Sequence, residues 1–83
     1  MQDGKHVILC VDDDPDVLFS LKTVLEANGY VFAGADSAED GLETYKQVQP
    51  DAVIVDLMME EVDAGTSFVK ELKALGNEAP IYM

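Results

Sequence analysis

The chain has 83 residues, enough for one small domain and too few for two separate hydrophobic cores. Its formal net charge is −12, with 17 acidic and five basic side chains, which argues against nucleic acid or an anionic membrane as a direct partner. A hydrophobic content of 48% argues against disorder, and no apolar run is long enough to cross a membrane. No signal-peptide pattern precedes the first apolar run, and the single cysteine excludes an internal disulfide, so we expect a cytoplasmic protein.

The first predicted strand runs from His6 to Val11, and a helix follows it. Asp14 is a typical N-cap, Pro15 suits the first helical position, and Gly29 is the expected stop. The apolar residues of this helix form a wide stripe: Val17, Leu18, Leu21, Val24 and Leu25. With no second histidine or thiolate cluster to support a site, His6 is interpreted as a strand-edge residue.

The second predicted strand covers Tyr30 to Ala35, and Ser37 begins a second helix through a pattern similar to a capping box. Pro50 ends this helix, because the residue before a proline is pushed out of the helical region. The inner face of the helix is predicted to consist of Leu42, Tyr45 and Val48.

Ala52 to Val55 is a run of four apolar residues, typical of a strand buried on both faces, and it leads directly into Asp56. An acidic loop from Leu57 to Ala64 is followed by a third amphipathic helix, with Gly76 as its stop, and Pro80 to Met83 begin a fourth strand. The apolar face of the third helix is predicted to consist of Phe68, Val69, Leu72 and Leu75. The alternation of strands and helices predicts an α/β fold with a parallel sheet and right-handed crossovers.

Three carboxylates follow two of these apolar strands. If the two strands are parallel neighbours, Asp12, Asp13 and Asp56 meet at the carboxyl edge of the sheet, where open α/β folds bind ligands. Two carboxylates about 4 Å apart repel by roughly 4 kcal/mol at an effective dielectric constant near 20. A hard divalent cation such as Mg²⁺ removes that conflict and leaves positions for phosphate oxygens, which suggests Mg²⁺-assisted phosphoryl chemistry.

The acids allow three other interpretations. Asp12, Asp14 and Asp16 have the spacing that opens an EF-hand calcium loop, but Val17 and Thr23 stand where that loop needs Gly and Glu, so calcium is excluded. Helix capping and solvation explain Asp14 and Asp16, but not the acids at the two strand ends. A metal-dependent phosphohydrolase is a weaker alternative: Asp12-x-Asp14 is similar to a nucleophile and acid pair, but no basic residue near the acids is evident to hold a substrate phosphate.

These residues identify a family. The run from Val7 to Val17, followed by Asp56-Leu-Met-Met59 and Asp63, resembles the receiver domain of two-component response regulators. The resemblance implies a flavodoxin-like parallel sheet of order 2-1-3-4-5 and a phosphoryl group accepted on Asp56 from a histidine kinase or a phosphotransfer protein. It also implies that Asp13 and Asp56 bind Mg²⁺ directly, that Asp12 acts mainly through water, and that the Met58 carbonyl completes the ligands.

The sequence departs from the family in two ways. Glu60 and Ala64 stand where the family usually has Pro and Gly, so the loop after Asp56 is expected to have a different shape, with Gly65 supplying flexibility one position later. Residues 1–83 would also form a single receiver domain that is truncated, with the last part of strand four, helix four, strand five and helix five absent. The family's phosphate-contacting Ser or Thr and Lys would then be missing, so phosphorylation of Asp56 by a small phosphodonor is expected to be slow. Tyr82 lies in strand four and is not the family's aromatic switch residue.

Two hypotheses follow. In the first, the chain is a phosphoacceptor signalling module rather than an enzyme, with at most self-phosphorylation and autodephosphorylation chemistry. In the second, it is a non-catalytic assembly module. The surface that truncation would expose, including the strand Ala52–Val55 and the edge at strand four, is expected to drive formation of a closed homo-oligomer.

Overall fold

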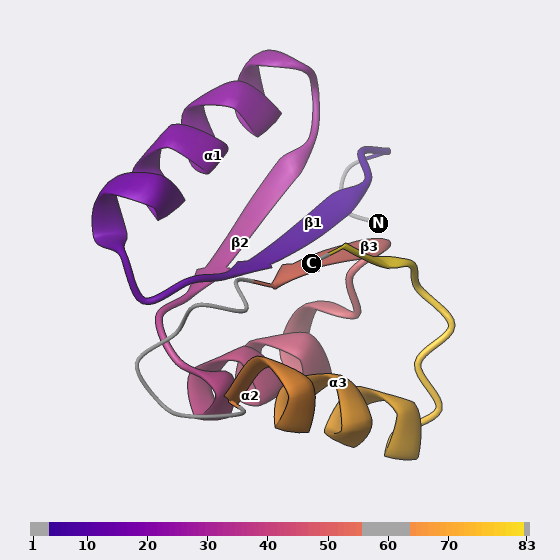
Figure 1. Ribbon diagram of the computed structural model, residues 1–83. Helices are drawn as coiled ribbons and strands as arrows, with labels where there is room; N and C mark the ends of the chain where they lie inside the picture. The colour runs from indigo at the N-terminus through magenta and orange to yellow at the C-terminus, as the bar shows by residue number, and fades with distance from the viewer. Residues whose placement is uncertain (1–3, 56–63, 83) are drawn as a thin grey trace.

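The computed structural model describes residues 4–55 and 64–82, in which strands and helices alternate as predicted (Figure 1). The elements in chain order are β1 (Val7–Val11), α1 (Pro15–Ala27), β2 (Val31–Ala35), α2 (Ala38–Val48), β3 (Ala52–Val55), α3 (Ala64–Ala74) and β4 (Ile81–Tyr82). The first, second and fourth strands each begin one residue later than predicted, and the predicted last residue, Met83, lies outside the described residues. The third helix begins at Ala64, which the sequence had placed in the preceding loop.

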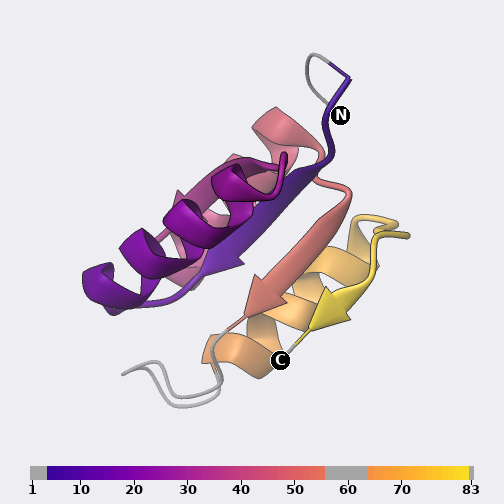
Figure 2. The same cartoon turned by 90° about the horizontal axis from the view of Figure 1, so that it is seen from above.

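The four strands form one parallel sheet of order β2-β1-β3-β4, as the resemblance implied for these strands. The helix α1 lies on one face of the sheet, and α2 and α3 lie side by side on the other (Figure 1). Viewed from above, α1 covers β1 and β2, whereas β3 and β4 extend beyond it (Figure 2). The fold is therefore a three-layer α/β arrangement with unequal cover on its two faces.

The helix ends form where local sequence specifies them. The Asp14 side chain accepts a hydrogen bond from the Asp16 N–H at 2.9 Å, and Pro15 is the first residue of α1. Ser37 caps α2 by accepting from the Asp40 N–H at 3.1 Å. Gly29, with φ of 84°, takes the left-handed conformation just after α1, which confirms it as the stop.

The core lies between the sheet and the pair α2 and α3. Phe68 and Leu72 of α3 are fully buried, which confirms the inner face predicted for that helix, while Leu75 follows the helix and is exposed. They pack against alternate residues of the strands, so this face of the sheet is buried at its centre, whereas Ala33 of β2 and Ile81 of β4 are partly buried. The buried cluster consists of Leu9, Val11, Ala35, Val53, Val55, Phe68 and Leu72, and Leu42 and Tyr45 of α2 pack against it.

The predicted apolar stripe of α1 is only partly covered by the sheet. Leu18, Leu21 and Leu25 are half-buried, but Val17 and Val24 retain 39% and 58% of their accessible surface. Burial on both faces, typical of such an apolar run, is not found in β3, since Ala52 and Ile54, which point away from the core cluster, are half-buried; this agrees with the expectation that the strand is partly bare on one face. Both differences have one physical cause: α1 packs on β1 and β2 and leaves β3 uncovered on that face.

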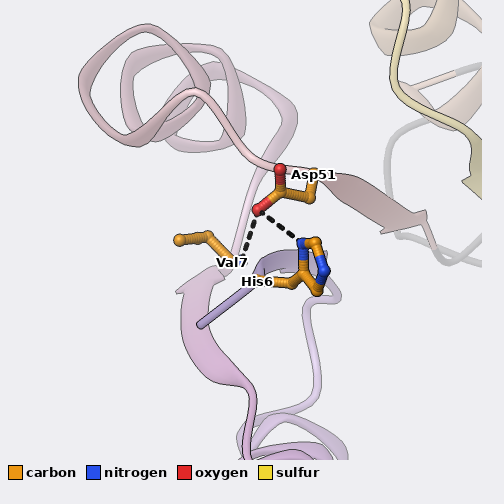
Figure 3. Close-up of polar contacts among 3 residues, drawn as sticks. All are labelled: His6, Val7 and Asp51. Carbon is orange, nitrogen blue, oxygen red and sulfur yellow. Dashed lines mark hydrogen bonds and ion pairs between the residues drawn. The ribbon is translucent and has the colours of Figure 1, made fainter. Parts of the chain in front are cut away.

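One carboxylate joins β1 and β3 at the edge of the sheet where these strands begin. Asp51 Oδ2 accepts a hydrogen bond from the Val7 N–H at 2.7 Å and lies 3.6 Å from His6 Nδ1 (Figure 3). The Asp51 N–H in turn donates to the Val7 carbonyl at 2.7 Å. The backbone hydrogen bond from Val7, with smaller contributions from the amino terminus and His6, holds the pKa of Asp51 below its usual value.

This geometry predicts that Asp51→Asn destabilises the fold at neutral pH. A carboxyl group whose pKa is lower in the folded state stabilises that state above its unfolded pKa, and the stabilisation is lost as pH falls through the folded pKa. Urea unfolding at pH 7 and pH 3 measures the effect. The difference in the free energy of unfolding between wild type and Asp51→Asn should be smaller at pH 3. Glu26→Gln, at an exposed site on α1, is the control. An equal difference in the free energy of unfolding at both pH values would contradict the stabilising role assigned to the Asp51 carboxylate.

Candidate functional site

The carboxyl end of β1 carries consecutive acidic residues that have different structural roles. Asp12 is buried, with 8% of its surface exposed, and its backbone N–H donates to the Ala35 carbonyl at 3.0 Å. Its Oδ1 accepts from the Asp14 N–H at 2.9 Å. The Asp12 side chain is therefore held at the point where β1, β2 and the loop before α1 meet.

The next two acids, Asp13 and Asp14, differ in burial and in structural role. Asp13 is half-buried beside Asp12, whereas Asp14 is exposed and caps α1. The structure thus confirms helix capping for Asp14, whereas Asp12 and Asp13 lie directly at the end of β1.

The strand β3 lies next to β1 in parallel register, with Val11 opposite Val55, the last residue of β3. Asp56 and Met58, predicted as phosphoacceptor and carbonyl ligand, lie outside the described residues, as do Glu60 and Asp63. Among residues 4–55 and 64–82, no group of three or more His, Cys, Asp or Glu side chains is placed to hold a metal ion. Asp12 and Asp13 are oxygen donors of the kind Mg²⁺ prefers, so the part of the site within those ranges fits the predicted metal.

Cys10 lies in β1, two residues before Asp12, and is fully buried. Burial, together with the negative charge of Asp12, raises the pKa of its thiol to about 11. A thiol with such a pKa is protonated at neutral pH, so Cys10 is a packing residue and not a nucleophile.

A second acidic surface, which was not predicted from the sequence, lies beside β2. Asp36, Asp40 and Glu43 line a groove beside β2, at the sheet edge opposite β4. The signal for it is the spacing of Asp40, Glu43, Thr44 and Gln47, which places four polar residues along one side of α2.

Comparison with known proteins identifies the class. The sequence profile of the response regulator receiver domain matches residues 8–83, and the chain therefore belongs to the receiver domain family. Receiver domains are signalling domains of two-component phosphorelay systems. They are not classical enzymes, and they interact with histidine kinases or phosphotransfer proteins.

Individual relatives agree with this assignment. The chain is 38% identical over 74 residues to the transcriptional regulatory protein PrrA of Mycobacterium tuberculosis, covering 89% of this chain and 31% of PrrA. It is 38% identical over 79 residues to the chemotaxis protein CheY of Bacillus subtilis, covering 94% of this chain and 65% of CheY. The chain thus spans less than two thirds of either relative.

Solved structures show the same fold. A crystal structure of a receiver domain protein from Clostridium thermocellum superimposes with a TM-score of 0.83 at 27% sequence identity. The match covers 92% of this chain and 61% of that one. In the described part of the chain, no helix is both long and apolar enough to span a membrane.

Proposed function

We propose that this chain is a phosphoacceptor module in which Asp56 receives a phosphoryl group from a histidine kinase or a phosphotransfer protein. The observation that supports the proposal most directly is the placement of Asp12 and Asp13 at the end of β1, beside the strand that leads into Asp56. In the transfer, a carboxylate oxygen of Asp56 attacks phosphorus, the bond from phosphorus to the donor breaks, and an acyl phosphate forms. Formation of an acyl phosphate on Asp56 that depends on Mg²⁺ is the direct test.

Asp12, Asp13, Asp56 and the Met58 carbonyl would hold Mg²⁺, which neutralises charge on the transferring phosphoryl group when bound. Burial of Asp12 contributes by limiting the water around its charge, which strengthens its attraction for a cation. The hydrogen bonds to Ala35 and Asp14 keep the Asp12 backbone and carboxylate in place. The net charge of −12 supports a protein partner and a cation in preference to nucleic acid, and a cytoplasmic location fits a phosphorelay module.

The Mg²⁺ site is tested by thermal unfolding. At a Mg²⁺ concentration ten times the dissociation constant, binding to the folded state should add about 1.4 kcal/mol of stability and raise Tm by roughly 5–10 °C. Asp13→Asn should abolish most of this rise, because a ligand carboxylate is lost. Asp16→Asn, which removes an exposed acid in the first turn of α1, should retain it. An equal rise in both variants would mean that Mg²⁺ acts on surface charge in general.

A second candidate function is assembly, which one observation favours. On the face of the sheet that carries α1, Ile54 of β3 pairs with Tyr82 of β4, and Tyr82 keeps 60% of its surface exposed. Exposed apolar surface of this kind is typical of an interaction site. The candidate predicts self-association of the chain without any need for phosphorylation.

A further inference from the structure

A groove lies at the outer edge of β2, on the opposite side of the sheet from β4. Its volume is about 570 Å³, and residues from α1, β2 and α2 line it. Leu18 of α1 and Phe32 of β2 supply apolar surface, and α2 supplies polar side chains. The groove therefore follows a strand edge and has one apolar and one polar wall.

Some backbone N–H and C=O groups of β2 face away from β1, toward the groove. The Val31 N–H donates to the His6 carbonyl at 2.9 Å, and the Ala35 carbonyl accepts from the Asp12 N–H at 3.0 Å. In a parallel ladder alternate residues bond to the same neighbour, so the N–H and C=O groups of Phe32 and Gly34 are directed away from β1. Within residues 4–55 and 64–82, no strand pairs with this side of β2.

The polar wall of the groove is acidic. Asp36, Asp40 and Glu43 line it. Asp36 and Asp40 line the same groove, and a side-chain hydrogen bond with Asp36, together with the negative charge of that residue, raises the pKa of Asp40. A cationic side chain placed between them would relieve this repulsion.

We propose that the β2 edge binds an extended, basic segment of another protein, which adds to the sheet as a further strand. An added strand would form hydrogen bonds with Phe32 and Gly34, and its Lys or Arg side chains would lie against Asp36, Asp40 and Glu43. Its apolar side chains, which alternate with the basic ones, would contact Leu18 and Phe32.

Charge decides between possible occupants. A second copy of this chain has 17 acidic and only five basic side chains, so it offers few cations to an acidic groove and is a poor match for this site. A metal ion alone does not account for the apolar wall, and no metal-holding group of three ligands is found in the described ranges. A basic segment matches the charge, the apolar wall and the strand edge together.

The probe is an acetylated and amidated hexapeptide of alternating Lys and Val, added to the isotopically labelled chain. We expect saturable changes in the amide NMR signals of Phe32, Gly34 and α2. Asp40→Asn combined with Glu43→Gln should weaken binding about tenfold, since two charged contacts are lost. The matched control combines Glu26→Gln with Glu39→Gln, which removes the same charge from two exposed sites that do not line the groove, and should change binding by less than about twofold.

A second measurement separates strand addition from attraction between charges. Methylating the peptide nitrogens along one edge removes the donors that would bond to β2 but keeps every lysine charge, so this peptide should not bind. Circular dichroism checks that each variant is folded. The proposal is overturned if the Lys-Val peptide does not bind, if both double variants weaken it equally, or if the methylated peptide binds as well as the parent.

Discussion

Replacing Asp56 with Asn should abolish acyl phosphate formation when the chain is incubated with acetyl phosphate and Mg²⁺. The amide cannot act as the attacking oxygen in the transfer, so no acetate is displaced and no acyl phosphate accumulates. Trapping of the acyl phosphate followed by peptide mass analysis locates the label. In the wild-type chain, we expect the label on the peptide that contains Asp56 and on no other.

Two controls make the labelling result specific. Asp13→Asn should greatly slow labelling but leave its position unchanged, because the residue is proposed to hold the metal and not the phosphoryl group. Asp36→Asn removes an exposed acid just after β2 and should label like wild type. Label on Asp12 or Asp13, or undiminished labelling of Asp56→Asn, would show that the acceptor has been assigned to the wrong residue.

Local features of the fold could be predicted because neighbouring residues determine them. The caps at Asp14 and Ser37 and the stop at Gly29 require only a hydrogen bond or a positive φ within a few residues. The strand order came from the family resemblance, and the structure confirms it for four strands.

Features that depend on distant contacts could not be predicted in the same way. The bond from Val7 to Asp51 joins residues 44 positions apart, and it exists because the register of β1 and β3 brings them together. Tyr45 Oη donates to Asn77 Oδ1 at 2.9 Å for a similar reason, linking α2 to the turn before β4. Periodicity located the apolar stripe of α1 but could not show that Val17 and Val24 would lack a covering neighbour.

The candidate site, like the fold, was predicted only in part. Two apolar strands leading into acids indicated where Asp12 and Asp13 would lie, and the structure confirms their placement at the end of β1. The groove beside β2 could not be predicted from the sequence, because its walls come from three elements that only the folded structure brings together. Asp56 remains a prediction supported by the family and by the position of β3.

The uncovered face of β3 and β4 should make this 83-residue chain associate with itself. Cys10, Ile54 and Tyr82 occupy paired positions across β1, β3 and β4, on the side away from the core cluster. Cys10 is fully buried, whereas Ile54 is half-buried and Tyr82 is mostly exposed, so cover decreases from β1 towards β4. Burying about 300 Å² of apolar surface would contribute about 7.5 kcal/mol at about 25 cal/mol per Å², before the entropy lost on association is subtracted.

We therefore expect a dimer or larger closed assembly at micromolar concentration, measured by light scattering coupled to size exclusion. Tyr82→Lys should shift the equilibrium towards monomer, because a charge would enter the apolar contact. The matched control is Phe19→Lys, which makes the same change at an aromatic residue of α1 that is 70% exposed, and it should leave the assembly intact. Since the net charge of −12 opposes unlimited aggregation, the assembly should have a defined size. A wild-type chain that is monomeric and melts cooperatively at these concentrations, or equal dissociation of both variants, would exclude this face as the contact.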